Sequence, residues 1–226
     1  MTIDVVVFRV VGARIEVLTV ERLHNPFAGR RALPGVWVGA GETLLDACHR
    51  CLAEKAGLGH IHRRDASSPT SATVARPLTE PRQFLAADSV ARDPRGHAVS
   101  IVHMAAARAD VSLVSGESPA WLDVGVLVAG GSAGLAFDHL EVVVAARRFL
   151  ADRLWADAAC FTVLAGDAPL TTPTLRTIAE SAGGVELDHA NFSRRLASSG
   201  LFVSRQAEVS TVRSRGRPAI VWEPAR

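Results

Sequence analysis

Hydrophobic residues in the first 20 positions fall into two runs rich in β-branched side chains. The runs lie within residues 4–20, DVVVFRVVGARIEVLTV, on either side of Val11-Gly12-Ala13. Runs of this kind are typical of strands, and the glycine between them favours a tight turn. The pattern predicts a fold that opens with two antiparallel strands.

A helical period replaces the strand pattern between Glu42 and Ala56. Apolar residues recur there every three or four positions, so we expect a single buried helix face with Leu44, Ala47, Cys48, Cys51 and Leu52. Thr43 can cap the start of this helix. Gly57 is placed to end it in the left-handed conformation.

The middle of the chain predicts short elements. Residues 59–80 are polar and are expected to form a surface insertion, with a short edge strand as the alternative. Residues 82–107 contain two strand-like runs around turn residues at 91–97, which predicts a hairpin. Further short strands are expected over 111–127, with Trp121 in the core, and an amphipathic helix over 139–154.

The last 70 residues predict a winged helix-turn-helix. A helix is expected from about Thr171 to Ala182, and a second one over 189–198 buries Phe192 and Leu196, which lie one turn apart. Two strands are predicted at 201–206 and 219–222. Helix, turn, helix and hairpin in this order define the motif. We therefore expect an α+β chain with two domains, residues 1–155 and residues 156–226.

Composition is that of a soluble globular protein. The 226 residues are 48% hydrophobic and 21% charged, and the net charge of +2 is too small for a protein that coats nucleic acid generally. Cys48, Cys51 and Cys160 cannot close a disulfide framework, and we expect the C-x-x-C pair to be buried apolar residues rather than a metal or redox site. No secretory signal or membrane-length apolar run is recognised, so a cytoplasmic location without membrane contact is expected.

Positive charge concentrates near the C-terminus. Residues 189–222 contain six arginines and one glutamate, Glu208, which leaves a net charge of +5. A basic second helix followed by a basic loop is typical of duplex DNA binding, although a solvated charged surface is the alternative. The candidate DNA contacts are Asn191, Ser193, Arg194 and Arg195 on the helix and Arg213, Arg215 and Arg217 on the wing.

The segment from Leu33 to Leu58 resembles the Nudix box, G-x5-E-x7-R-E-U-x-E-E-x-G-U, where U is a bulky aliphatic residue. The matching positions are Glu42, Arg50, Leu52, Glu54, Gly57 and Leu58, and the departures are Val36, Cys51 and Lys55. Cys51 and Lys55 replace two of the three glutamates that would converge on magnesium, and a lysine there repels the ion. We therefore expect no catalytic or metal residues and no enzyme activity. A residual Mg²⁺-dependent pyrophosphohydrolase acting on ADP-ribose or a related nucleoside diphosphate is the alternative.

The whole chain resembles the NrtR family, the Nudix-related transcriptional regulators of NAD metabolism. The resemblance rests on the degenerate box at 36–58, Arg92-Asp93-Pro94-Arg95-Gly96, Phe137-Asp138-His139, Asn191-Phe192-Ser193-Arg194-Arg195-Leu196 and Arg215-Gly216-Arg217-Pro218. It implies an N-terminal Nudix α/β/α sandwich followed by the winged helix-turn-helix domain.

The resemblance also implies partners. Members of the family act as homodimers on palindromic double-stranded operators and usually respond to ADP-ribose, which releases the repressor from genes of NAD synthesis or salvage. For this chain we accordingly expect a nucleotide effector rather than a cofactor. Trp37, Arg50 and Arg92 are the candidate effector contacts.

Overall fold

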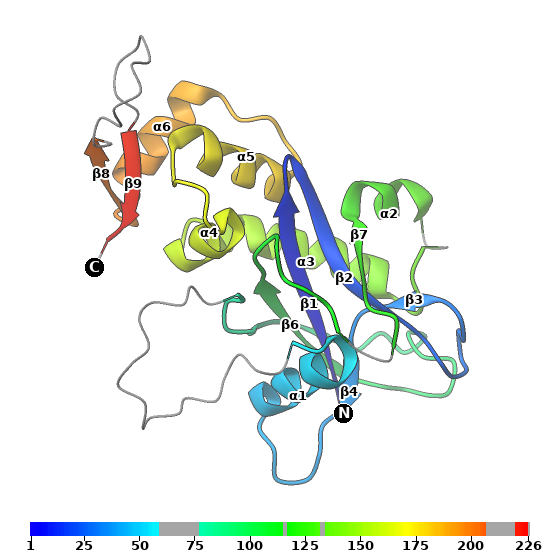
Figure 1. Cartoon of the computed structure of the whole chain (residues 1–226). Helices are drawn as coiled ribbons and strands as arrows, with labels where there is room; N and C mark the ends of the chain where they lie inside the picture. The colour runs from blue at the N-terminus through cyan, green and yellow to red at the C-terminus, as the bar shows by residue number, and fades with distance from the viewer. Residues whose placement is uncertain (59–76, 115–116, 132–133, 207–219, 226) are drawn as a thin grey trace.

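The computed structural model describes residues 1–58, 77–114, 117–131, 134–206 and 220–225. These residues form an α+β fold around a seven-stranded mixed sheet, with a two-stranded sheet near the C-terminus (Figure 1). The strands of the large sheet are β1 (Thr2–Val11), β2 (Arg14–Glu21), β3 (Arg31–Ala32), β4 (Gly35–Trp37), β5 (Arg82–Ala87), β6 (Ser100–Ala106) and β7 (Ala120–Asp123). Their order is β3-β2-β1-β6-β5, with β4 paired to β1 and β7 to β2. Only the β1–β6 pairing is parallel among the described strands.

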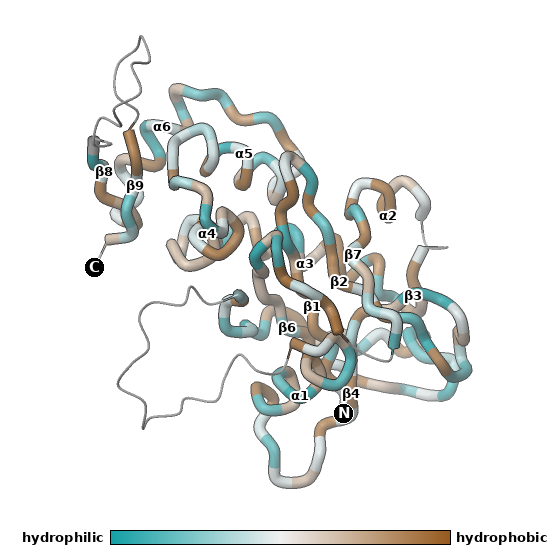
Figure 2. Tube along the Cα trace, viewed as in Figure 1, coloured by the Kyte–Doolittle hydropathy of each residue, from teal (hydrophilic) through white to brown (hydrophobic). Residues whose placement is uncertain are grey.

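The valine-rich run of β1 is buried on both faces of the sheet. Residues 3, 5 and 7 belong to one hydrophobic cluster, and residues 6, 8 and 10 belong to another on the opposite face. A strand with both faces covered reads as an almost continuous apolar run, as this one does (Figure 2). The antiparallel β1–β2 pair predicted from residues 4–20 is confirmed.

Helix α1 (Leu44–Ala56) covers one face of the sheet. Thr43 caps it, because its hydroxyl accepts a hydrogen bond from the Asp46 amide while the Asp46 carboxylate accepts one from the Thr43 amide. Gly57 ends the helix with a φ of 70°. The predicted helix, its cap and its glycine stop are confirmed.

Helix α3 (His139–Arg153) lies behind the sheet in Figure 1 and contributes to the second hydrophobic cluster. This confirms the helix predicted over 139–154. The predicted hairpin is also confirmed, because β5 and β6 pair antiparallel around the turn residues 91–97. Of the predicted insertion, residues 59–76 lie outside the described part, and Leu78 makes an isolated bridge to Ala107.

Of the short strands predicted over 111–127, β7 is the only one that forms among the described residues. The prediction is wrong after Asp123, where the chain enters α2 (Val124–Gly130). The Asp123 side chain accepts a hydrogen bond from the Val126 amide, and this cap starts a helix that buries Val124 and Leu127. Trp121 is partly buried and packs against the cluster beneath α1 rather than lying at its centre.

The C-terminal part is a winged helix-turn-helix, as predicted. Its elements are α4 (Ala158–Ala165), α5 (Thr172–Gly183), α6 (His189–Ser198), β8 (Phe202–Gln206) and β9 (Ile220–Pro224). The small sheet is fixed to the start of α5, because the Trp222 indole N–H donates to the Thr172 hydroxyl at 2.9 Å and the Trp222 amide donates to Leu170. Helix α4 was not predicted, since its almost entirely apolar sequence has no polar face to give a period.

One hydrophobic cluster extends from the large sheet into the winged helix. It includes Val6 and Phe8 of β1, Leu150 of α3, Ile178 of α5 and Phe192 of α6. The two parts therefore share a core across the region where the sequence predicts a domain boundary, and that boundary stays a prediction. Within the described residues, no helix is long and apolar enough to cross a membrane.

Candidate functional site

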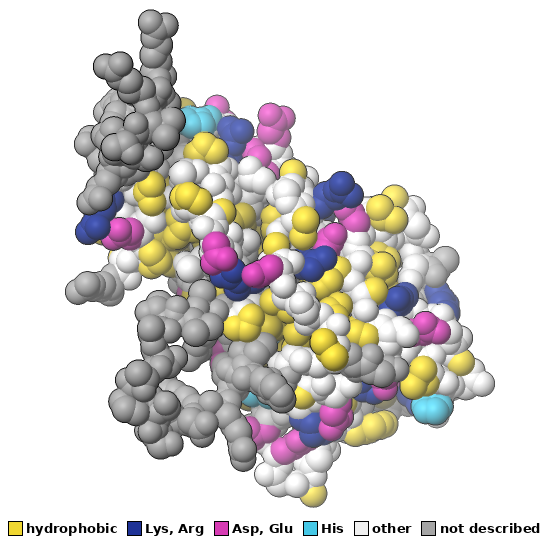
Figure 3. All heavy atoms as spheres, in the orientation of Figure 1, with side chains coloured by type: hydrophobic (Ala, Val, Ile, Leu, Met, Phe, Trp, Pro, Cys, Tyr) yellow, Lys and Arg dark blue, Asp and Glu magenta, His cyan; other side chains and the backbone are white. Residues whose placement is uncertain are grey.

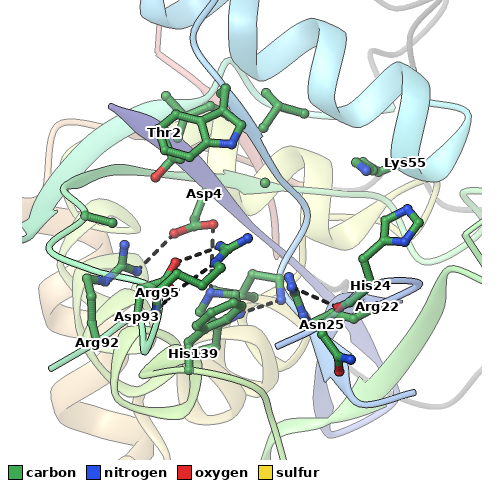
Figure 4. Close-up of a pocket in the computed structure, with 17 residues that line it drawn as sticks. Thr2, Asp4, Arg22, His24, Asn25, Lys55, Arg92, Asp93, Arg95 and His139 are labelled. Atoms are coloured by element: carbon green, nitrogen blue, oxygen red, sulfur yellow. Dashed lines mark hydrogen bonds and ion pairs between the residues drawn. The ribbon is translucent and has the colours of Figure 1, made fainter. Parts of the chain in front are cut away.

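A cavity of about 340 Å³ opens at the end of the large sheet where β1 begins. Three segments surround it: the β2–β4 connection, the loop between β5 and β6, and the residues just before and at the start of α3. Its walls consist of Thr2, Ile3, Asp4, Arg22, His24, Asn25, Leu33, Gly35, Val36, Trp37, Lys55, Arg92, Asp93, Arg95, Ala98, Phe137 and His139. Figure 4 shows Asp4, Arg92, Asp93 and Arg95 pointing toward one another, with Lys55 and His24 together on another side.

A buried charge network forms one wall. The Arg92 guanidinium donates two hydrogen bonds of 2.9 Å to the Asp138 carboxylate and one of 3.2 Å to Asp4. His139 accepts a hydrogen bond from the Leu33 amide at Nδ1, so in its neutral form Nε2 carries the proton and faces Asp4 at 3.8 Å. Burial lowers the pKa of His139 and favours that neutral form.

The side chains that line the cavity carry more positive than negative charge, and Asp138 and Glu117, outside the lining, pair with two of the cations. Four of its lining side chains are arginine or lysine and two are aspartate. Burial first, and the nearby charge of Arg95 second, lower the pKa of Arg22, which means that its cation lacks full compensation. A site of this kind favours an anionic ligand.

Aromatic side chains complete the cavity. The Arg22 guanidinium lies 4.5 Å from the ring centre of Phe137, so one face of that ring is occupied. Trp37, by contrast, is 63% exposed at the mouth. A second hollow of about 100 Å³ shares Arg22, His24 and Lys55 with the cavity. Together the two hollows offer cations for phosphate, and Trp37 offers an exposed indole for a base.

The retained residues of the Nudix box are engaged with one another. Arg50 donates to both oxygens of Glu42, at 2.6 and 3.1 Å, and to Glu54 at 3.4 Å. The Arg50 hydrogen bond lowers the pKa of Glu42 to about 2. Arg50 also donates to the Trp37 carbonyl at 2.8 Å. Arg50 thus supports the segment that carries Trp37 but is not itself among the residues that line the cavity.

These residues do not fit a magnesium cluster. The Cys51 thiol is fully buried, and burial raises its pKa well above the ordinary range. Lys55 is held at 2.5 Å by Glu117, so its charge is partly balanced by a carboxylate outside the box. Among the described residues, no group of three or more His, Cys, Asp or Glu side chains is arranged to hold a metal ion. Cys48 is likewise buried, and the pKa of its thiol rises to about 12.

Helix α6 presents a narrow polar face to solvent. Phe192 and Leu196 are buried, whereas Asn191, Arg194 and Ser198 are exposed on the opposite side. The Arg194 guanidinium donates to the Asn191 side-chain oxygen, which holds the two side chains together. Ser193 lies at the edge of this face and is partly buried.

Arg195 differs from Arg194 in its surroundings. Its guanidinium lies 3.9 Å from the ring centre of Trp155, in the segment between α3 and α4. The candidate contacts Arg213, Arg215 and Arg217 lie outside the described residues. On the face seen in Figure 3, basic and acidic side chains lie side by side in several places. The roles assigned to the α6 residues stay predictions.

Two of the three effector contacts predicted from the sequence, Trp37 and Arg92, line the same cavity. Three further lining residues, Asp4, Arg22 and His24, were not predicted. Asp4 could have been recognised from the sequence, because an aspartate inside a valine-rich strand is unusual. Arg22 and His24 lie in a connection whose sequence has no recognisable pattern.

Comparisons with known proteins agree with this architecture. No family model matches the chain. The ADP-ribose pyrophosphatase of Methanocaldococcus jannaschii is 30% identical over 131 residues, which are 57% of this chain and 63% of that protein. The chain thus spans less than two thirds of the curated relative that it matches.

Solved structures extend the likeness to both parts. Shewanella oneidensis NrtR has a TM-score of 0.67 at 23% identity and covers 99% of this chain and 92% of its own. The same protein complexed with a 27mer DNA gives 0.67 at 24% identity, with 99% and 93% covered. Its Nudix domain complexed with ADP ribose gives 0.50 at 26% identity, with 66% and 86% covered. The predicted fold, a Nudix domain followed by a winged helix, is therefore confirmed.

Proposed function

We propose that this chain is a DNA-binding transcriptional regulator whose Nudix domain binds ADP-ribose or a related nucleotide and controls the DNA affinity of the winged helix. Its targets are genes of NAD synthesis or salvage, which it represses in the absence of effector. One observation carries the proposal. A cavity lined by cations and an exposed tryptophan shares a hydrophobic core with a winged helix whose second helix exposes arginines.

The cavity supports a nucleotide ligand. Arg22, Arg92 and Arg95 supply donors for a diphosphate, and Asp4 supplies an acceptor for a sugar hydroxyl or an amine. Trp37 supplies a surface for a base. Two of the similar proteins are associated with this ligand: the archaeal one is an ADP-ribose pyrophosphatase, and the Nudix domain of the Shewanella regulator was solved in complex with ADP ribose.

The winged helix supports operator binding. In this motif the second helix enters the major groove, where the N-terminal residues of the helix reach base edges. Asn191 and Arg194 occupy the exposed face of α6, and such side chains recognise adenine and guanine edges. Because each copy offers a single recognition helix, a palindromic site requires two copies, and we propose a homodimer. Light scattering of the full chain, alone and with operator, tests that state.

Isothermal titration calorimetry of the full chain with ADP-ribose tests the effector assignment. The expected result is saturable binding that weakens markedly in Arg92→Ala and Trp37→Ala. The control is Arg148→Ala, which changes an exposed arginine of α3 and should leave the affinity for ADP-ribose unchanged. Absence of heat and of any thermal shift with ADP-ribose and with related dinucleotides would reject a nucleotide effector.

A residual Mg²⁺-dependent pyrophosphohydrolase is the second candidate, and the identity to an ADP-ribose pyrophosphatase favours it. Two observations argue against hydrolysis: Arg50 hydrogen-bonds Glu42 and Glu54, and Cys51 is buried. Release of AMP from ADP-ribose separates the two. The regulator shows none above background, whereas the hydrolase shows Mg²⁺-dependent release that disappears in Glu54→Gln.

A further inference from the structure

Helix α3 extends from the cavity to the winged helix. His139, its first residue, and Phe137, just before it, line the cavity, and Asp138 supports the wall through Arg92. Further along, the helix packs against α5 (Figure 1). Its buried side chains form one stripe from His139 to Leu150, so the helix is packed along most of its length and has contacts at each end.

The cavity end of α3 has an unusual cap. Asp138 occupies the N-cap position, but its side chain makes no capping hydrogen bond to the helix. Its carboxylate is instead held by two hydrogen bonds from Arg92, which also serves Asp4. An aspartate at this position ordinarily accepts from an amide in the first turn, so Arg92 and the helix compete for one carboxylate.

The opposite half of α3 holds the helix-turn-helix by an arginine. The Arg147 guanidinium donates to the Ser181 and Ala182 carbonyls at 2.8 and 3.0 Å. These carbonyls lie in the last turn of α5, where a cation is favoured by the helix dipole. Arg148, the next residue, is exposed and forms no hydrogen bond or ion pair with the described part of the chain.

Just beyond α3, Trp155 contacts the recognition helix directly. Its ring lies 5.5 Å from Phe192 and 5.8 Å from Phe161, both edge to face, and it carries the Arg195 guanidinium at 3.9 Å. A guanidinium stacked on an aromatic ring is an oriented contact rather than a solvated charge. Arg195 thereby connects α6 to the end of α3.

We propose that α3 transmits effector binding to the recognition helix, with the Arg92–Asp138 pair as its input and the Arg147 and Trp155–Arg195 contacts as its outputs. This inference rests on the proposed function. It assigns Arg195 to positioning of α6 rather than to reading of bases, in contrast to Arg194.

The input follows from charge. An anionic ligand in the cavity offers Arg92 a further acceptor and weakens its hold on Asp138, whose carboxylate is then available to cap α3. The ligand can shift the position of α3 only if its affinity differs between these two arrangements, and the shared guanidinium provides that difference. A displacement of α3 then reaches α5 and α6 through the two outputs.

The test measures coupling in the full chain. Operator affinity is determined by fluorescence anisotropy without and with saturating ADP-ribose, and the ratio of the two dissociation constants is compared among Arg195→Met, Arg147→Met and their neighbours Arg194→Met and Arg148→Met. We expect a wild-type ratio of about tenfold or more. It should fall below about threefold in Arg195→Met and Arg147→Met, where the contact to α3 is lost.

The neighbouring variants separate coupling from simple damage. Arg194→Met should weaken operator binding and keep the wild-type ratio, and Arg148→Met should keep both. Asp138→Asn tests the input. Without ADP-ribose, the operator affinity of this variant should approach that of the wild type with ADP-ribose bound. A role limited to structural support would lower operator affinity in these variants without changing the ratio.

The outcomes distinguish the inference from the function beneath it. Wild-type ratios in both Arg195→Met and Arg147→Met, with ADP-ribose bound and operator released as in the wild type, overturn the α3 route alone. Absence of ADP-ribose binding to the wild type by calorimetry overturns the proposed effector and the inference together.

Discussion

Replacing Gly184 by alanine probes the contact between α3 and α5 without altering a charged residue. Gly184 caps α5 in the left-handed conformation, with a φ of 70°. A Cβ at this position would meet the Arg147 guanidinium at 2.7 to 3.0 Å, so Arg147 must move away from the carbonyls that it caps. Gly200, which follows α6, has the same backbone sign, a φ of 71°, and open space around it. It is the matched control.

The magnitude follows from two terms. A left-handed conformation costs a non-glycine residue about 1–2 kcal/mol, and Gly200→Ala pays this term alone. Gly184→Ala adds the loss of two charge-assisted hydrogen bonds, about 1–2 kcal/mol in all after allowance for water that replaces them. We therefore expect Gly184→Ala to lower the free energy of unfolding by about 1–2 kcal/mol more than Gly200→Ala does.

Urea denaturation followed by far-UV circular dichroism measures this difference. In thermal unfolding it corresponds to a gap of about 2–8 °C between the two variants for a chain of this length. Equal destabilisation of the two variants would refute the reasoning, because it would show that the Arg147 contact contributes nothing. In an Arg147→Met background the two hydrogen bonds are already absent, so Gly184→Ala should there cost only the left-handed conformation and destabilise the protein about as much as Gly200→Ala does.

Three further predictions follow from individual contacts. Trp37→Ala should weaken ADP-ribose binding by about 1–3 kcal/mol, the range for base stacking on an aromatic ring, with Trp121→Phe as a calorimetric control. Arg194→Ala should lower operator affinity at least about tenfold at constant salt, and unchanged affinity would remove this residue from the interface. Glu42→Gln should destabilise the protein at neutral pH, because the depressed pKa of Glu42 means that its contribution is present above about 4.5 and is lost as the pH falls toward about 2. Denaturation midpoints of wild type and variant should accordingly converge in acid.

Elements with a clear period or a local end signal were predictable from the sequence. Thr43 and Gly57 bracket α1 at the expected positions, and Phe192 with Leu196 gives the buried side of α6. In each case the information lies within one or two turns of the element itself. The cap, the stop or the apolar stripe therefore needed no knowledge of the rest of the chain.

Elements decided by distant contacts were not predictable. Helix α4 is buried against several neighbours and lacks a polar face, and α2 follows a strand with no break other than the Asp123 cap. The cavity is a further case, because Asp4, Arg22 and Arg92 come from three separate segments that only the sheet brings together. Arg195 could not be distinguished from Arg194 by sequence, since the difference is the Trp155 ring from another helix junction.

In the function proposed above, a nucleotide in the Nudix cavity controls DNA binding by the winged helix. The most direct measurement is a fluorescence anisotropy titration of the full chain against the promoter DNA upstream of its own gene cluster, without and with ADP-ribose. We expect a specific complex at moderate salt that ADP-ribose dissociates, with no release of AMP during the experiment. A specific complex that is indifferent to ADP-ribose and to related nucleotides would contradict it, and so would Mg²⁺-dependent hydrolysis by a chain that binds no DNA.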